Sequence, residues 1–158
     1  MADYSQANKS RADGYTFDSE AEKRFYLEYL KYWPFRLDIH PNFRVRDKYT
    51  LGGYTCRGRS YKPDFVLYDR EGEIYHVYDV KGSIVPRMDK NGVERAKVYI
   101  DASMRKSIDD FQRRQHIPVE IVTPMKGRFR MTILGPTKPI GVHEFTGVDY
   151  DVKKIIGM

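Results

Sequence analysis

Two short β-prone runs, separated by a polar connector, constrain this chain more than any other feature. Residues 65–68 and 74–78 are rich in β-branched and aromatic side chains. The connector, residues 69–73, is polar, contains a glycine and has the length of a hairpin loop. We therefore predict two adjoining antiparallel strands in this region.

Ionisable side chains gather at the open end of the predicted hairpin. If Tyr68 pairs with Ile74, Asp64 lies opposite the residue before Asp79 and next to Asp79 itself. Side chains alternate along a strand, so Asp79 and Lys81 project from one face, about 6–7 Å apart. The spacing predicts that two carboxylates and one ammonium group converge.

Such a cluster suits metal-assisted hydrolysis of a phosphodiester. Mg²⁺ takes oxygen ligands, usually one or two carboxylates together with waters and substrate phosphate oxygens. A nearby lysine can orient the attacking water or offset negative charge. The alternative is purely structural: Asp64 begins a strand, and Asp79 pairs with Lys81 on the surface.

A third carboxylate comes from a predicted helix within residues 16–30. Ser19 is placed as its N-cap, and Glu22 stands three residues later, as in a capping box. At 100° per residue, Glu22 lies at the head of the apolar face that would pack on the sheet. The capping box alone also explains a glutamate at this position.

These motifs resemble the PD-(D/E)xK nuclease superfamily. The resemblance rests on Phe17-Asp18-Ser19 with Glu22, then Pro63-Asp64-Phe65, then Asp79-Val80-Lys81-Gly82, and it spans about residues 15–123. The similarity is greatest to small phage-encoded nucleases of that group. Other members include Holliday-junction resolvases, transposon end-cleaving nucleases, restriction enzymes and phage exonucleases.

The resemblance implies an α/β fold with a restriction-endonuclease-like core. Its central mixed β-sheet is flanked by helices in the order α-β-β-β-α-β, with extra strands at the C-terminus. It implies metal binding by Asp64, Asp79 and the Val80 carbonyl, catalytic participation by Lys81, and a supporting carboxylate at Glu22. The implied cofactor is Mg²⁺, with Mn²⁺ as a substitute.

The expected function is a metal-dependent endonuclease that hydrolyses DNA phosphodiester bonds; the sequence leaves the DNA structure that is cut open, with branched or junction DNA among the candidates. The alternative is a non-catalytic nucleic-acid-binding protein on a degenerate nuclease fold. A role on branched DNA would favour a symmetric homodimer that places two sites on opposed strands. The interface would come from the N-terminal arm or from residues 124–158.

Charge agrees with a nucleic-acid partner. The chain of 158 residues has a formal net charge of +6, and phosphate contacts give salt-sensitive, sequence-independent affinity. Basic residues concentrate in 44–62 and in 121–143, the latter without any acid. The candidate nucleic-acid-binding residues are Arg57, Arg59, Lys62, Arg105, Lys106, Lys126, Arg128 and Arg130. Residues 126–130 are expected to place three cations on one strand face, with Phe129 on the other, where they would follow the phosphates. The alternative is a solvated outer strand face.

The chain is long enough for one domain with a core. We expect a flexible polar arm at 1–14, the nuclease core at 15–123 and a basic β extension of the same domain at 124–158. Further predictions are a helix over 102–114, strands over 116–123, 129–134 and 142–145, a hairpin turn at 51–54, and a mobile loop over 86–95.

Several classes of protein are excluded or disfavoured. No apolar stretch approaches eighteen residues, so we expect no membrane association. A single cysteine, Cys56, excludes an internal disulfide and a cysteine–zinc cluster, and it suits a reducing cytoplasm, that of the host if the protein is phage-encoded. The four histidines are scattered without ligand spacing, and His76 is assigned to packing or surface.

Overall fold

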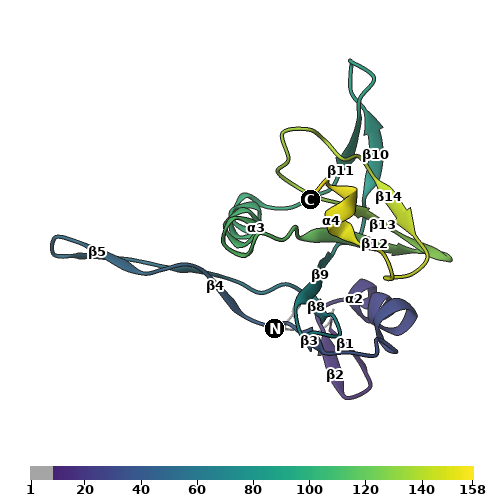
Figure 1. Ribbon diagram of the computed structural model, residues 1–158, viewed down its shortest axis with the longest axis horizontal. Helices are drawn as coiled ribbons and strands as arrows, with labels where there is room; N and C mark the ends of the chain where they lie inside the picture. Colours follow the sequence, from purple (N-terminus) through teal and green to yellow (C-terminus); the bar gives the residue numbers. More distant parts are fainter. Residues whose placement is uncertain (1–8) are drawn as a thin grey trace, which may run out of the picture.

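The computed structural model describes residues 9–158 and has a mixed α/β fold built on one six-stranded sheet (Figure 1). The strand order is β14-β13-β12-β9-β8-β3. The pair β9–β12 is parallel and the other four pairs are antiparallel. The predicted central mixed sheet is therefore confirmed.

The sheet strands are β3 (Leu37–Ile39), β8 (Phe65–Tyr68), β9 (Ile74–Val80), β12 (Glu120–Met125), β13 (Arg128–Thr132) and β14 (His143–Phe145). The helices are α2 (Glu20–Phe25), which continues into the π-helix η1 (Tyr26–Leu30), α3 (Ala102–Gln115) and α4 (Val152–Ile155). The smaller hairpins pair β1 (Ser10–Ala12) with β2 (Tyr15–Phe17), β4 (Phe43–Arg46) with β7 (Arg59–Tyr61), β5 (Tyr49–Leu51) with β6 (Tyr54–Cys56), and β10 (Val85–Met88) with β11 (Glu94–Lys97).

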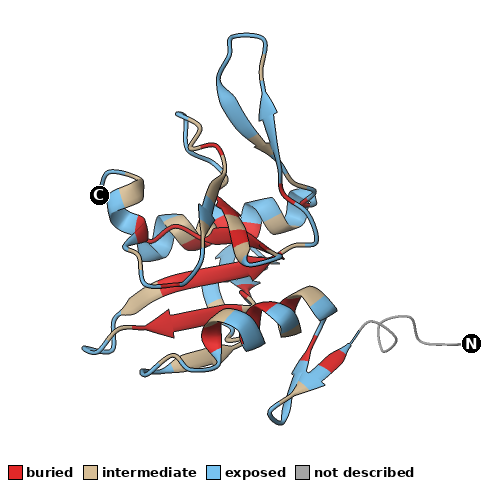
Figure 2. Cartoon of the chain, turned by 90° about the vertical axis from the view of Figure 1, so that its right-hand side faces the viewer, coloured by how far each residue is buried: buried red, intermediate tan, exposed pale blue. Residues whose placement is uncertain are grey.

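The central strands are buried on both faces, so each side of the sheet has its own core. Tyr78 and Val122 pack with residues of α2, η1 and α4 on one side. Their neighbours in the chain, Val77 and Ile121, pack with residues of α3 on the other. This alternation follows from the two-residue period of a strand. Figure 2 shows the buried residues concentrated in the central strands.

A β-bulge corrects the register predicted for the hairpin. Tyr68 does pair with Ile74, but Leu67 pairs with His76, so Tyr75 is the extra residue. Phe65 is consequently opposite Tyr78. Asp64, which precedes Phe65, is therefore level with Asp79 and not with Tyr78. The bulge improves the convergence of the two carboxylates.

Two hairpins project from the body of the protein. The pairs β4–β7 and β5–β6 form one long ribbon, and β10–β11 forms a second (Figure 1). The predicted turn at 51–54 joins β5 to β6, as expected. The prediction of a loop over 86–95 was wrong, because four residue pairs between Val85 and Lys97 form an antiparallel ladder.

The ends of the chain also differ from the prediction. Residues 10–12 pair with 15–17 as a strand, so 9–14 is not wholly a loose arm, while residues 1–8 lie outside the described part.

The strand expected over 116–123 begins only at Glu120, because His116 ends α3 in a left-handed conformation. In residues 9–158 no helix has the length and apolar character needed to cross a membrane.

Candidate metal centre

The first carboxylate of the centre is held by the start of α2. Ser19 is the N-cap, and its hydroxyl accepts a hydrogen bond from the Glu22 backbone N–H at 3.1 Å. In a full capping box the Glu22 carboxylate would return to the N-cap. Instead it lies 2.8 Å from His40 Nε2 and is only 4% exposed. Glu22 is therefore directed into the site.

Three carboxylates from two segments surround His40 Nε2. Glu22 Oε1 lies 2.8 Å away, Asp18 Oδ2 3.5 Å and Asp64 Oδ1 3.8 Å. One ligand atom from each of these residues lies within 4.8 Å of all the others. Three carboxylates and one imidazole thus form a cluster that could hold a metal ion.

The backbone fixes this arrangement. His40 has a φ of 52°, a left-handed conformation that is uncommon outside glycine and costs free energy. Its N–H donates to the Asp64 carbonyl at 3.0 Å, and the Asp64 N–H donates to Tyr78 at 3.0 Å. His40 and Asp64 are therefore tied to each other and to the end of β9.

Asp79 lies beside this cluster, not within it. Its Oδ1 is 2.9 Å from Lys81 Nζ, and its Oδ2 accepts a hydrogen bond from the Tyr61 hydroxyl at 2.7 Å. Asp79 is 2% exposed, so both partners compensate a charge that has little contact with water. The Asp79–Lys81 pair of the structural alternative is present, but Asp79 is buried and not at the surface, and Tyr61 is an additional member.

Val80 connects the two halves of the site. Its backbone N–H donates to Asp64 Oδ2 at 2.7 Å. A residue in a strand directs its N–H and C=O to the same side, so the Val80 carbonyl also faces Asp64. Beyond this point the β9–β12 ladder ends, because Pro124 has no N–H to donate. The Thr123 hydroxyl donates to the Lys81 carbonyl instead, at 2.8 Å.

The pKa values show an excess of negative charge. Burial, and then the charges of Asp79 and Glu22, raise the pKa of Asp64 well above its usual range, although the Val80 N–H and Lys81 oppose this. The hydrogen bond that His40 donates to Glu22 raises the pKa of His40 against the effect of burial. A bound cation would stabilise the charged form of Asp64 and take the place of the proton on His40.

The donor set fits a divalent cation. Carboxylate oxygens suit hard ions such as Mg²⁺ and Mn²⁺, and an imidazole is accepted more readily by transition metals. Cys56 is the only cysteine of the chain and is not among the four clustered residues, which disfavours a soft-metal site. The ligand chemistry thus limits the metal to divalent ions that bind mainly oxygen ligands.

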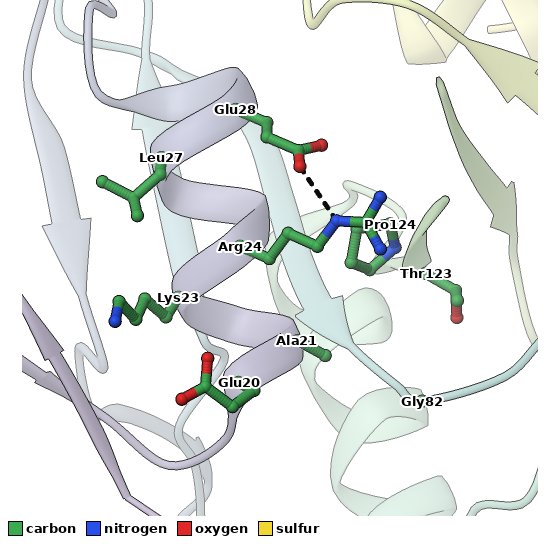
Figure 3. A pocket seen from close by; sticks show the side chains of 9 residues that line it. All are labelled: Glu20, Ala21, Lys23, Arg24, Leu27, Glu28, Gly82, Thr123 and Pro124. Atoms are coloured by element: carbon green, nitrogen blue, oxygen red, sulfur yellow. Dashed lines mark hydrogen bonds and ion pairs between the residues drawn. The ribbon is translucent and has the colours of Figure 1, made fainter. Parts of the chain in front are cut away.

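Two hollows lie at residues 81–82, on the Lys81 side of the centre. A groove of about 630 Å³ runs between α2 and the ends of β9 and β12, and Gly82 lines it directly after Lys81. Figure 3 shows Arg24 and Glu28 on the side of α2 that faces Pro124. A second hollow, of about 590 Å³, is lined by Lys81, Lys97 and Tyr99. Both hollows could admit an extended ligand next to Lys81.

The predicted nucleic-acid-binding residues fall into two groups. Arg57, Lys62, Lys106 and Lys126 are exposed, as is Arg105. The other three are engaged within the protein: Arg59 donates to Ser103 and Ser107, and Arg128 and Arg130 bond to Glu144 at 3.0 and 3.2 Å. Lys126 belongs to the turn before β13, so it does not share a strand face with Arg128 and Arg130 as predicted.

The sequence interpretation missed Asp18, His40 and Tyr61. Asp18 precedes the N-cap and belongs to the motif that carries the resemblance, where it has no assigned role. His40 precedes the long ribbon and Tyr61 ends it, and only the pairing of β3 with β8 brings His40 to Asp64. The left-handed backbone of His40 leaves little sequence signal, because only a small fraction of histidines adopt this conformation. His76 was assigned to packing or surface, and it is fully buried, so packing is the part of that prediction that holds.

Comparison with known proteins gives one match. Residues 1–117 match the model of the family DUF1064, described as "Protein of unknown function". No curated protein and no solved structure matches the chain. The matched residues include all the side chains of the candidate centre and the long ribbon. Because the match covers well over half of the 158 residues, the chain belongs to the DUF1064 family.

Proposed function

We propose that this protein is a metal-dependent endonuclease that hydrolyses DNA phosphodiester bonds on a restriction-endonuclease-like core. The observation that carries the proposal is the convergence of Glu22, His40 and Asp64 beside the pair formed by Asp79 and Lys81. Such a combination of clustered carboxylates and an adjacent lysine suits phosphodiester hydrolysis better than a structural role.

Asp64, Glu22 and His40 would hold the cation, with Asp18 at the outer edge. Asp79 and the Val80 carbonyl, which face Asp64, would complete the set on the other side. A bound divalent ion would polarise the phosphoryl group and lower the pKa of a coordinated water. The protein contributes buried carboxylates that are fixed in place by backbone hydrogen bonds.

Lys81 acts as a cation in this mechanism. Burial alone would lower the pKa of its ammonium group, but the carboxylate of Asp79 outweighs this and keeps the pKa above its ordinary value. A lysine that stays protonated at neutral pH orients water and offsets charge on the phosphate. This disfavours a role for Lys81 as general base.

Cleavage assays test the proposal directly. The full chain should be incubated with Mg²⁺, Mn²⁺ or EDTA and a panel of junction, flap, duplex and single-stranded DNA. We expect cleavage of at least one substrate with metal and none with EDTA. Binding to DNA without cleavage of any substrate would overturn the proposal in favour of a non-catalytic binding protein.

Metal binding should also stabilise the fold. A ligand at a hundred times its dissociation constant contributes about 2.7 kcal/mol to the free energy of unfolding. For a protein of this size the Tm should rise by about 5 °C or more. Differential scanning fluorimetry with and without Mn²⁺ measures this shift. Glu22→Gln should lose the response, and Glu28→Gln, in the next turns of the same helix, should keep it.

A further inference from the structure

The long ribbon formed by residues 43–61 grows out of the candidate metal centre. Its first strand begins three residues after His40, and its last strand ends three residues before Asp64. The nine residues from Phe43 to Leu51 span about 30 Å when extended. Figure 1 shows the ribbon pointing away from the sheet. Whatever binds the ribbon is therefore close to the metal centre at one end.

The inner half of the ribbon, β4 and β7, is anchored on α3. The rings of Phe43 and Tyr61 contact Phe111, with centroids 5.2 and 5.5 Å apart. Arg59 donates to the Ser107 hydroxyl at 3.2 Å. The base of the ribbon thus has a fixed direction, while β5 and β6 extend beyond it.

The ribbon carries positive charge that the protein does not neutralise. Within residues 9–158, none of its cations has a carboxylate within 4.0 Å except Arg59; the others are Arg44, Arg46, Lys48, Arg57 and the adjoining Lys62. Its one acid, Asp47, lies 3.3 Å from Arg114. An array of unpaired cations on an exposed ribbon is complementary to a polyanion.

The tip of the ribbon is apolar on one face. Leu51 pairs with Tyr54, and Tyr49 pairs with Cys56, so these side chains share a face. Tyr49, Leu51 and Tyr54 are 55%, 67% and 78% exposed. Large apolar side chains grouped on a projecting element indicate a binding surface. The opposite face of the tip carries only Thr50 and Thr55.

We propose that the ribbon is a DNA-binding arm that selects sites where a duplex adjoins unpaired bases. The cations contact the duplex phosphates, and a two-stranded ribbon fits the major groove. Tyr49 and Tyr54 stack on unpaired bases, an interaction that tolerates any sequence. In an intact duplex each base face is covered by the neighbouring bases. The two tyrosines can therefore stack only where bases are unpaired, and the tip distinguishes such sites from a continuous duplex. The inference rests on the proposed function, because it names the substrate class of the same site.

A second copy of this chain is a less suitable occupant for the ribbon. Two such arms would bring two sets of unpaired cations together, and like charges repel. A polyanion is attracted by the same charges along the whole ribbon. Charge therefore favours DNA over self-association, and the experiment below separates the two.

Binding measured in EDTA tests the arm without any cleavage. Fluorescence anisotropy should compare the full chain on a forked DNA and on a fully paired duplex of equal length. We expect Tyr49→Ala with Tyr54→Ala to weaken binding to the fork by at least about tenfold and to leave binding to the duplex unchanged. The matched control is Thr50→Ala with Thr55→Ala, on the opposite face, which should bind both DNAs like the wild type.

A second pair of substitutions tests the cations. Arg46→Gln with Lys48→Gln should weaken binding to both DNAs and reduce the slope of log affinity against log salt by about 2. A fork carrying 2-aminopurine at its unpaired bases should lose fluorescence with the wild type and not with the tyrosine variant.

Three results would overturn the inference. The first is a tyrosine variant that binds the fork as tightly as the wild type. The second is equal loss of affinity for fork and duplex. The third is sedimentation that shows a wild-type dimer dissociated by the tyrosine substitutions, which would assign the tip to a second copy. Because no metal is present, these results stand whether or not the protein cleaves DNA.

Discussion

Asp64→Asn should abolish DNA cleavage and preserve or tighten DNA binding. The substitution removes a negative charge from the cluster, while the amide oxygen of the asparagine can still take the place of Asp64 Oδ2 as acceptor for the Val80 N–H. A positioned catalytic group typically contributes a factor of about 10²–10⁴ to the rate, so we expect a loss of at least about 100-fold. Relief of repulsion between the site and phosphate should leave the Kd in EDTA equal or lower.

The measurement pairs a cleavage time course in Mg²⁺ with anisotropy in EDTA. Asp109→Asn is the matched control, because it makes the same change of charge on an exposed residue of α3. It should cut and bind like the wild type. Cleavage by Asp64→Asn at the wild-type rate would remove Asp64 from the catalytic centre.

His76→Ala should be the most destabilising single substitution considered. His76 and Glu120 are both 0% exposed and are joined by a hydrogen bond between β9 and β12. The second ring nitrogen lies 2.7 Å from the Val148 carbonyl, and Tyr150 donates to Glu120 at 2.6 Å. Removal of His76 leaves the buried carboxyl of Glu120 with Tyr150 alone, leaves the Val148 carbonyl without the ring nitrogen and opens a cavity, which together cost about 3–5 kcal/mol.

The Tm of His76→Ala should therefore fall by about 10 °C. The pKa of Glu120 is already raised, chiefly by burial, and the imidazole of His76 opposes that shift. Thermal unfolding followed by circular dichroism measures the change. Glu144→Ala removes a carboxylate from an exposed ion pair and should leave the Tm close to that of the wild type. Equal Tm values for both variants would contradict this reading of the core.

The central hairpin and its charges were accessible from the sequence because strand periodicity acts locally. The runs around residues 69–73 predicted β8 and β9, and Ser19 predicted the start of α2. The bulge at Tyr75 was not predictable, because one inserted residue changes neither composition nor alternation over so short a strand. It nevertheless decides that Asp64 is level with Asp79.

Side chains brought in by long-range pairing were beyond a local pattern. His40 reaches the centre only because β3 pairs with β8 across 25 intervening residues. The sequence also does not show which cations are neutralised by a carboxylate. Arg128 and Arg130 are predicted to be free cations from the sequence, and only the β13–β14 register places Glu144 beside them. The sequence alone therefore overestimates the charge available to a ligand on that strand.

The position of the ribbon between His40 and Asp64 has a consequence for how such chains can diversify. Pairing from Leu37 with Leu67 to Ile39 with Phe65 closes the base of the insertion. The spacing of the two clustered side chains is thus independent of the number of residues between them. Lengthening, shortening or exchanging the outer residues 49–56 would alter the reach of the ribbon and leave in place the carboxylates and Tyr61, which donates to Asp79. The proposed chemistry and the proposed recognition are thus assigned to separable parts of one continuous segment.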